Sequence, residues 1–346
     1  GVKAQTFEVS STTTQEYVVS AANLPAAAAH RVDVVFTNDA YDAATGQDRN
    51  LYVDRLRFNG RDYLTNTDQL VLDYGTGTGA RDGMNITLSS TGVIASNAAL
   101  RFSLDGSDRL DGGAGADTLV GGTGDDIYYV DNVSDAVVEL SGQGFDTVRS
   151  SVSHSLASHV DNLMLTGSAV SGTGNDLANL ILGNSGNNIL DGGAGTDSLR
   201  GSAGADTLIG GLGNDLVDGG AGNDTYRFSR GHGQDSIWES DTTVGNQDVL
   251  SFDSSVAYDQ LWFKRVGNNL EVSVIGTTDK LTVSNWYVSS QWHVEQVAAS
   301  DKILVDTQVQ ALVDAMASMT PPPLGQTALS AAQASALQPV LASSWQ

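Results

Sequence analysis

Short alternating runs of apolar and polar residues fill the first 103 positions of the chain. The runs lie at 6–10, 17–19, 31–37, 51–58, 69–74, 85–88 and 100–104. A period of two places successive side chains on opposite faces, as in a strand with one buried face. Asn59 and Gly60 follow the fourth run and are residue types that close a two-residue hairpin. Short strands at this spacing predict a β-sandwich over residues 1–103.

A different period governs the middle of the chain, where one large apolar residue recurs in each nine-residue unit. Seven units share the pattern Gly-x-x-Gly-x-[Asp/Asn]-x-apolar, and they begin at Gly112, Gly121, Gly183, Gly192, Gly201, Gly210 and Gly219. Their apolar positions are Leu119, Tyr128, Leu190, Leu199, Leu208, Val217 and Tyr226. One such side chain cannot form a core alone, so neighbouring units must stack. The period therefore predicts a solenoid over residues 104–240, with a spacer rich in Ser, Val and Leu at about 148–173.

Alternation returns after residue 241. Runs at 249–252, 261–266, 270–275 and 280–283 predict antiparallel strands, with a hairpin turn at Gly267, Asn268 and Asn269. The open ends of a solenoid expose apolar coils, so a cap is physically required. These strands predict that cap.

A helix is predicted at 308–319. Thr307 and Gln310 would form its capping box, and prolines 321–323 would end it. Its apolar face contains Val309, Leu312, Val313 and Met316. The last segment, 327–346, carries the apolar residues Leu337, Val340, Leu341 and Trp345. We expect it to dock on the cap or to bind a partner.

The sixth position of the nine-residue units is acidic or an amide. These residues are Asp117, Asp126, Asn188, Asp197, Asp206, Asp215 and Asp224. Winding the chain aligns them in columns, and two unit charges about 4.8 Å apart repel by roughly 3 to 4 kcal/mol at an effective dielectric near 20. Carboxylates and free carbonyls suit Ca²⁺, and glycine permits the left-handed turns that expose such carbonyls. The glycines assigned to these turns are Gly113, Gly115, Gly122, Gly124, Gly193, Gly195, Gly204, Gly211, Gly213, Gly220 and Gly222.

The segment from Gly112 to Tyr226 resembles the RTX repeat Gly-Gly-x-Gly-x-Asp-x-apolar-x, a calcium-binding β-helix nonapeptide. This resemblance implies a parallel β-roll with two units per turn and several Ca²⁺ ions. Each ion would lie between one loop and the loop two units along. The implied pairs are Asp197 with Asp215, Asp206 with Asp224, and Asn188 with Asp206.

Weaker units flank these repeats. The unit at 174–182 has Asn179 in its sixth place, so its site shared with Asp197 would be weak. The unit at 103–111 keeps Asp108, which would pair with Asp126. Segments 142–148 and 231–237 read Gly-x-Gly-x-Asp-x-apolar outside the nine-residue frame and are interpreted as closing turns. The alternative, a flexible Gly/Asp linker, does not account for the strict period.

The predicted sandwich has one segment dense in side-chain oxygens. Asp39, Asp42 and Asp48 are candidate Ca²⁺ ligands, and Asn38 and Asn50 would support them. Segment 36–54 resembles calcium-dependent xylan-binding carbohydrate-binding modules, in which the ion coordinates sugar hydroxyls. The alternative is an ion that only stiffens the loop, since no tryptophan precedes Trp238 to form a sugar platform. The run from Asp259 to Tyr287 resembles the haemolysin-type calcium-binding related domain, with Trp262, Phe263 and Trp286 as cap core.

These patterns together predict an all-β chain. It comprises an N-terminal β-sandwich at 1–103, a parallel β-roll at 104–240 and a C-terminal antiparallel β cap with one or two short helices at 241–346. No uninterrupted apolar stretch approaches the eighteen residues of a membrane span, the sequence does not start with a basic and apolar signal peptide, and residue 1 is Gly. We therefore expect a longer precursor or an added residue at the start.

Composition narrows the functional classes. The chain has 41 acidic and 17 basic residues, which argues against nucleic acid as a partner, and it has no cysteine for disulfides or zinc. Calcium can stabilise a secreted protein that lacks disulfides. The RTX resemblance implies export by a type I system with an uncleaved C-terminal signal, placing the protein outside the cell or at its surface.

No catalytic motif is found, since the five histidines form no His-Glu-x-x-His and no Gly-x-Ser-x-Gly is present. We therefore expect a protein that is not an enzyme. One hypothesis is a secreted polysaccharide-binding protein. The other is a subunit of an extracellular fibre or biofilm matrix, in which N-terminal strands or the C-terminal tail of one copy complete the next.

Overall fold

The computed structural model describes residues 107–346 with their side chains, except residues 114, 240, 242, 244 and 301, and the backbone of six earlier strands. It contains two compact units. One consists of Gly1–Tyr128 with Ser134–Val138, and the other of Tyr129–Val133 with Glu139–Gln346. Strand β9, Ile127–Val130, spans the division. Nearly all regular structure is β, as predicted.

The first unit contains an antiparallel sheet of five strands in the order β1-β2-β3-β4, with β5 paired to β3. These strands are β1 (Glu16–Ser20), β2 (Val32–Thr37), β3 (Leu51–Phe58), β4 (Arg61–Asp62) and β5 (Leu70–Leu72). Phe58 pairs with Arg61, which confirms the hairpin predicted at 59–60. The expected strands at 6–10 and 85–88 lie outside the described residues, so the sandwich stays a prediction.

The same unit contains a parallel sheet in the order β10-β8-β6. Its strands are β6 (Leu100–Phe102), β8 (Thr118–Val120) and β10 (Ala136–Val138), and β7 (Arg109–Asp111) lies between the first two in the chain. Leu119 pairs with Val137, eighteen residues later, and both are buried. The first repeats therefore wind with two nine-residue units per turn.

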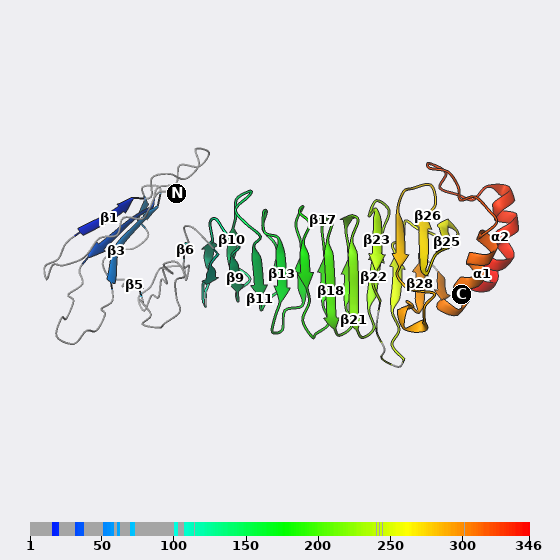
Figure 1. Cartoon of the computed structure of the whole chain (residues 1–346), viewed down its shortest axis with the longest axis horizontal. Helices are drawn as coiled ribbons and strands as arrows, with labels where there is room; N and C mark the ends of the chain where they lie inside the picture. Colours follow the sequence, from blue (N-terminus) through cyan, green and yellow to red (C-terminus); the bar gives the residue numbers. More distant parts are fainter. Residues whose placement is uncertain are drawn as a thin grey trace. The chain divides into compact units, whose positions relative to one another are not determined.

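The second unit is a roll in which the chain passes alternately between two sheets (Figure 1). The parallel strands of one sheet are β11 (Thr147–Ser150), β13 (Asn162–Leu165), β15 (Leu180–Leu182), β18 (Ser198–Ala203), β21 (Leu216–Ala221), β23 (Gln234–Ile237) and β27 (Lys280–Val283). Those of the other are β12 (His154–Ser155), β14 (Ser171–Thr173), β16 (Ile189–Asp191), β19 (Thr207–Ile209), β22 (Thr225–Phe228), β24 (Val249–Phe252) and β28 (Gln296–Ala299). Strands β17 (Ala194–Gly195) and β20 (Leu212–Gly213) pair within the loops.

The core of the roll is a stack of apolar side chains, one from each strand. Leu163, Ile181, Leu199 and Val217 occupy equivalent register positions in one sheet. Leu190, Leu208, Tyr226 and Leu250 do so in the other. All eight are buried. The predicted spacer continues the same two sheets through β11 to β14.

The cap differs in part from the prediction. Strands β25 (Leu261–Val266), β26 (Asn269–Val274) and β27 are antiparallel neighbours, as expected, and β29 (Lys302–Val305) pairs antiparallel with β28. However, β24, β27 and β28 run parallel to the preceding roll strands. Antiparallel pairing was wrong for β24, whose inward residues extend the stack of the roll. For β27 it is right on the side of β26, and the parallel pairing with β23 was not predicted. Short 3-10 helices occur at η1 (Tyr258–Gln260) and η2 (Ser290–Trp292).

Helix α1 (Asp306–Met316) packs on β25 and β29, and helix α2 (Ala331–Ser344) packs on α1 (Figure 1). Helix α1 (Asp306–Met316) buries Val309, Leu312, Val313 and Met316, as predicted. Its predicted capping box is wrong, because the helix begins before Thr307 and the Gln310 side chain donates to Asp314 instead. Helix α2 (Ala331–Ser344) begins with a capping box formed by Ser330 and Gln333.

The apolar residues of both C-terminal elements and the cap meet in one core. Leu337, Leu341 and Trp345 are buried, and the Trp345 ring lies 6.3 Å from that of Phe263. The last segment therefore docks on the cap of its own chain. Trp262, Phe263 and Trp286 are buried as expected. Neither helix in the described part of the chain combines the length and apolar character needed to span a membrane.

Candidate metal centre

Two columns of acidic and amide side chains run along the loops of the second unit. The first column contains Asn179, Asp197, Asp215 and Asp235, and the second contains Asn188, Asp206, Asp224 and Asp248. Each aspartate Oδ1 accepts a hydrogen bond from the backbone N–H of the preceding member, at 2.6 to 3.0 Å. This ladder joins each coil to the next through a side chain as well as through the sheets.

The other carboxylate oxygen of four aspartates has no hydrogen-bond partner. These oxygens are Oδ2 of Asp197, Asp206, Asp215 and Asp224, in residues that are only 1–3% exposed. A buried anionic oxygen is costly unless a hydrogen bond or a cation compensates for the lost water. Four such oxygens at regular intervals form a pattern that bound cations would satisfy.

Glycine leaves the space into which these oxygens point. A Cβ on Gly192 would lie 2.5 Å from Oδ2 of Asp197 and 2.3 Å from the carbonyl oxygen of Gly210 in the next coil. A carboxylate and a carbonyl oxygen therefore converge on one point, and both are ligands that Ca²⁺ prefers. All the glycines assigned to these turns from the sequence have positive φ, between 72° and 146°. The donor set and the open backbone fit calcium.

The electrostatic environment indicates the same need for positive charge. Burial raises the pKa of Asp197 to about 7 and the pKa of Asp206 and Asp224 to about 6, although backbone hydrogen bonds oppose the rise. Burial also raises the pKa of Asp215. Burial thus shifts these carboxyls towards the protonated form relative to exposed aspartates, and a divalent cation would favour the ionised form.

Two members of the columns were not predicted as ligands from the sequence. Burial raises the pKa of Asp235 to about 7 and that of Asp248 to about 8. They follow the previous member by 20 and 24 residues instead of 18, which takes them out of the nine-residue frame. The closing-turn motif at 231–237 contains Asp235, so the signal was present but was not interpreted as a continuation of the column.

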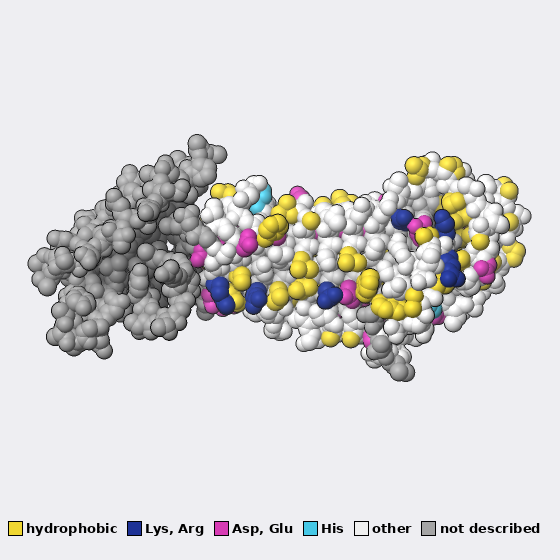
Figure 2. All heavy atoms as spheres, in the orientation of Figure 1, with side chains coloured by type: hydrophobic (Ala, Val, Ile, Leu, Met, Phe, Trp, Pro, Cys, Tyr) yellow, Lys and Arg dark blue, Asp and Glu magenta, His cyan; other side chains and the backbone are white. Residues whose placement is uncertain are grey.

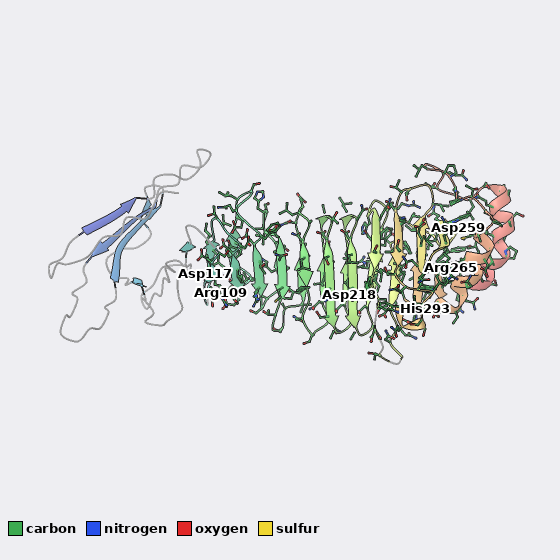
Figure 3. All side chains as sticks on the ribbon, viewed as in Figure 1. Arg109, Asp117, Asp218, Asp259, Arg265 and His293 are labelled. Atoms are coloured by element: carbon green, nitrogen blue, oxygen red, sulfur yellow. The ribbon has the colours of Figure 1, made fainter. Side chains whose placement is uncertain are left out.

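Other acidic residues of the roll lie outside the columns. Asp218, on β21, forms an ion pair with Arg200 on β18 at 3.0 Å (Figure 3). The visible face of the described roll is mostly uncharged or apolar (Figure 2). The aspartates of the columns, by contrast, are buried in the loops.

The first unit repeats the same ladder. The N–H of Asp108 donates to Oδ1 of Asp126 at 2.8 Å, and the N–H of Asp117 donates to Oδ1 of Asp135 at 2.9 Å. Asp108, Asp117 and Asp126 are all buried. The structure thus brings Asp108 and Asp126 together, and it adds Asp135, which the sequence did not indicate.

The candidate ligands of the N-terminal module and Asn188 differ from the other predicted ligands. Asp39, Asp42, Asp48, Asn38 and Asn50 lie outside the described residues, so their role stays a prediction. Asn188 lies in its column, but its amide nitrogen donates to the carbonyl of Ala169 at 3.0 Å. Its side chain therefore makes contacts that differ from those of the aspartates.

The comparison with known families agrees with this geometry. Residues 102–137, 173–208, 192–226 and 200–234 match the model of the RTX calcium-binding nonapeptide repeat. The central repeats are RTX repeats. Residues 1–73 match the calcium-dependent, xylan-binding carbohydrate-binding module, and residues 269–301 match the haemolysin-type calcium binding protein related domain. All three resemblances found in the sequence are confirmed, and they make this a calcium-binding chain with a carbohydrate-binding module.

Three curated relatives share short segments with the chain. Endo-1,3-1,4-beta-glycanase ExsH of Rhizobium meliloti (strain 1021) is 41% identical over 69 residues, which are 20% of this chain and 15% of that protein. Iron-regulated protein FrpA of Neisseria meningitidis serogroup C is 34% identical over 93 residues, 26% of this chain and 8% of the relative. Endo-1,3-1,4-beta-glycanase EglC of the same Rhizobium is 35% identical over 98 residues, 28% of this chain and 21% of the relative. The chain thus spans about a fifth or less of each relative.

Proposed function

We propose that this chain is an extracellular, non-enzymatic polysaccharide-binding protein whose RTX roll binds several Ca²⁺ ions and folds as they bind. The observation that carries this proposal is the set of buried, unpaired Oδ2 atoms of Asp197, Asp206, Asp215 and Asp224. Bound calcium would compensate for their charge. Asp235 and Asp248 would continue the two columns towards the cap.

Calcium concentration outside cells is sufficient to couple binding to folding. Extracellular calcium modules have dissociation constants of about 10⁻⁴ to 10⁻³ M. Free Ca²⁺ at ten times the dissociation constant would stabilise the folded state by about 1.4 kcal/mol per site. Several sites together would add an amount comparable with the whole stability of many domains. A roll of this kind would be weakly folded where calcium is scarce and stable outside the cell.

The carbohydrate proposal rests on the family match of residues 1–73. We infer that this module binds a xylan-like glycan through a calcium ion, with the acidic residues between 39 and 48 as ligands. Two of the relatives are named as glycanases, which is consistent with a setting rich in polysaccharide. Because RTX solenoids are typical of non-enzymatic calcium-binding proteins, we assign binding and no catalysis to this chain.

Metal analysis and circular dichroism of the purified chain test the calcium part. We expect several bound Ca²⁺ ions per chain, loss of β signal when a chelator removes them, and recovery on adding CaCl₂ but not on adding the same concentration of MgCl₂. A chain that holds no calcium, or that keeps its full β signal after exhaustive chelation, would contradict the proposal.

Affinity electrophoresis in gels that contain xylan tests the glycan part. We expect retardation with calcium and none with EGTA. The matched variant Asp42→Asn should lose retardation but keep the calcium response of the roll. Release of reducing sugars from the same xylan would show instead that the chain is an enzyme.

The fibre hypothesis gains no support from the described residues. Its C-terminal form needs apolar side chains that can reach another copy, whereas Leu337, Leu341 and Trp345 are buried in the cap of their own chain. Electron microscopy in millimolar calcium distinguishes the two hypotheses. We expect separate particles, and filaments would favour self-assembly.

A further inference from the structure

Two consecutive loops of the roll are closed by asparagine side chains. The first, residues 174–179, contains Asn175 and Asn179, and the second, residues 183–188, contains Asn184 and Asn188. We call them the asparagine loops. The loops that follow them in the columns end in Asp197, Asp206, Asp215 and Asp224, and we call these the aspartate loops. Both kinds have the same length and the same place in a coil.

In the first asparagine loop, amide nitrogens contact the carbonyls of the preceding coil. Nδ2 of Asn175 donates to the carbonyls of Ala157 and Val160, both at 2.8 Å. Nδ2 of Asn179 donates to the carbonyl of Asp161 at 3.0 Å and to that of Val160 at 3.2 Å. Oδ1 of Asn179 accepts from the N–H of Asn175 at 2.8 Å. Donor and acceptor of the buried Asn179 amide are therefore both satisfied.

The second asparagine loop repeats this arrangement. Nδ2 of Asn184 and Nδ2 of Asn188 both donate to the carbonyl of Ala169, at 2.8 and 3.0 Å. Oδ1 of Asn188 accepts from the N–H of Asn184 at 2.8 Å. Asn188 is 1% exposed, so these bonds are shielded from water. Four neutral amide groups in two loops thus hold carbonyls of the preceding coil.

The aspartate loops lack these amide bonds, although Oγ of Ser202, in the loop that ends in Asp206, donates to the carbonyl of Gly183 at 3.3 Å. Asp197 replaces Asn179 eighteen residues later, and its Oδ2 is buried without a partner. Gly193 stands where Asn175 stands, so no side chain is available to donate to the preceding coil. Gly193 also has φ +91°, whereas Asn175 has no left-handed backbone. The amide groups of the asparagine loops find their hydrogen-bond partners within the protein. The aspartate loops keep buried carboxylate oxygens that only a cation would satisfy.

We propose that the asparagine amides take the place of bound calcium, so that the coils from residue 157 to residue 190 fold without the metal and act as a template for the calcium-dependent coils at 191–248. An N–H donor aimed at a carbonyl contributes the positive partial charge that a cation would otherwise supply. The neutral amide also adds no charge to the column, so it avoids the repulsion that aspartate would create there. Asn179 and Asn188 therefore end the two calcium columns instead of ligating the first ions.

The coil beside the asparagine loops also contains neutral contacts. The N–H and the Oγ1 of Thr166 both donate to the carbonyl of Ser150, at 2.7 and 3.0 Å. Val160, Leu163, Leu165 and Ala169 are buried, so this coil contributes several apolar side chains to the core. These hydrogen bonds and apolar contacts support a metal-free fold for this segment.

Hydrogen exchange of the full chain, followed by mass spectrometry of its peptides, tests the proposal. The template proposal rests on the proposed calcium sites. In calcium, amides of both 160–190 and 191–248 should be protected. After calcium is removed, we expect protection at 191–248 to fall at least a hundredfold, while protection at 160–190 falls less than tenfold.

The outcomes separate the two proposals. No change anywhere on calcium removal would overturn the proposed calcium function. Equal loss in both segments would leave that function standing and overturn the template.

A pair of adjacent substitutions gives a second, independent readout. Asn188→Asp removes the donor to Ala169 and adds a buried charge, so exchange at 160–190 without calcium should accelerate about tenfold or more. Asn187→Asp adds the same charge one residue earlier, at an exposed position whose Oδ1 accepts from the N–H of Ala205 and would still do so. It should change exchange less than threefold. Equal effects of the two variants would show that the Asn188 amide has no special role.

Discussion

The asparagine loops and the aspartate loops solve the same structural problem in different ways. Each must join its coil to the preceding one where the chain leaves one sheet for the other. Amide nitrogens of Asn175 and Asn184 reach carbonyls directly. In the aspartate loops, a glycine or, before Asp206, Ser202 replaces the first asparagine, and the carboxylate of Asp197 or Asp215 keeps one unpaired oxygen. A repeat can thus be self-sufficient or dependent on an ion without changing its length or its apolar residue.

The largest effect we expect comes from the buried carboxyls of the aspartate loops. They should make the stability of the protein depend on pH in opposite directions with and without calcium. Burial raises the pKa of Asp197 and Asp235 to about 7 and of Asp248 to about 8. A carboxyl whose pKa is higher when folded stabilises the fold below its unfolded pKa, and this contribution is lost as the pH rises through the folded pKa. The metal-free protein should therefore unfold at a higher temperature at pH 5 than at pH 8.

The same measurement in saturating calcium should reverse the order, because protons compete with the metal for the carboxylates. Thermal scans by circular dichroism at both pH values, with calcium removed by a chelating resin, provide the check. The same pH dependence in both states would mean that the aspartate loops bind no cation.

The next largest effect should come from Asp206→Ala. This change removes the acceptor of the Asn188 N–H, which costs about 1 to 3 kcal/mol, and it also removes a ligand of the proposed calcium position between Asp206 and Asp224. The calcium concentration at half-maximal folding should rise more than for Asp108→Ala, which removes no ligand of the two columns. Asp218→Ala is the control, since its ion pair with the exposed Arg200 is worth about 0 to 1 kcal/mol. Equal calcium midpoints for the Asp206 and Asp108 variants would contradict our assignment.

The sequence predicted more of the roll than of its ends. The nine-residue period requires stacking, so the inward positions of Leu190, Leu199 and Leu208 could be assigned from spacing alone. The period fails where the chain enters the cap, and Asp235 and Asp248 were missed as column members for that reason. Antiparallel pairing was assumed for β24, and the parallel pairing of β27 with β23 was missed, because alternation does not specify strand direction. Only tertiary contacts distinguish a strand that extends a roll from one that turns back.

The asparagine loops were the least predictable feature of the site. From sequence, Asn188 occupies the same place as the aspartates, and it was assigned to a metal site shared with Asp206. In such a metal site, the side-chain oxygen of Asn188 would be the ligand. The structure shows that its nitrogen makes the contact with the preceding coil, through the carbonyl of Ala169. Asparagine spacing alone does not reveal which atom of the amide faces the coil.

The two kinds of loop also differ at their fourth position. In the aspartate loops, a Cβ on Gly213 would lie 1.6 Å from the carbonyl oxygen of Gly195, and its φ of +146° disfavours a side chain. At the same position of an asparagine loop, Gly186 has no left-handed conformation, and its Cβ would meet only the end of the Asn184 side chain at 3.2 Å. Gly213→Ala should cost more than about 2 kcal/mol, and Gly186→Ala less than about 1 kcal/mol.

Urea unfolding of both variants in saturating calcium measures this difference. The slope of the transition should be unchanged, so that the midpoints report stability. If the two alanines cost the same, the backbone of the two kinds of loop would not differ as described.

The smallest effect we expect comes from placing glycine at the second position of a loop, and it should have opposite signs in the two kinds of loop. Ser202 holds the second position of an aspartate loop with φ +87°, a conformation that costs a non-glycine residue about 1 to 2 kcal/mol. Ser202→Gly removes that strain but loses a hydrogen bond from Oγ to Gly183 and adds chain entropy to the unfolded state, so a net gain of about 0.5 kcal/mol is expected. Asn184→Gly, at the equivalent position of an asparagine loop, instead removes the donor to Ala169 and the acceptor of the Gly186 N–H, and it should lose about 1 to 3 kcal/mol. Urea midpoints measured in calcium should therefore rise for Ser202→Gly and fall for Asn184→Gly. A shift of both midpoints in the same direction would mean that the second loop position has one role throughout the roll.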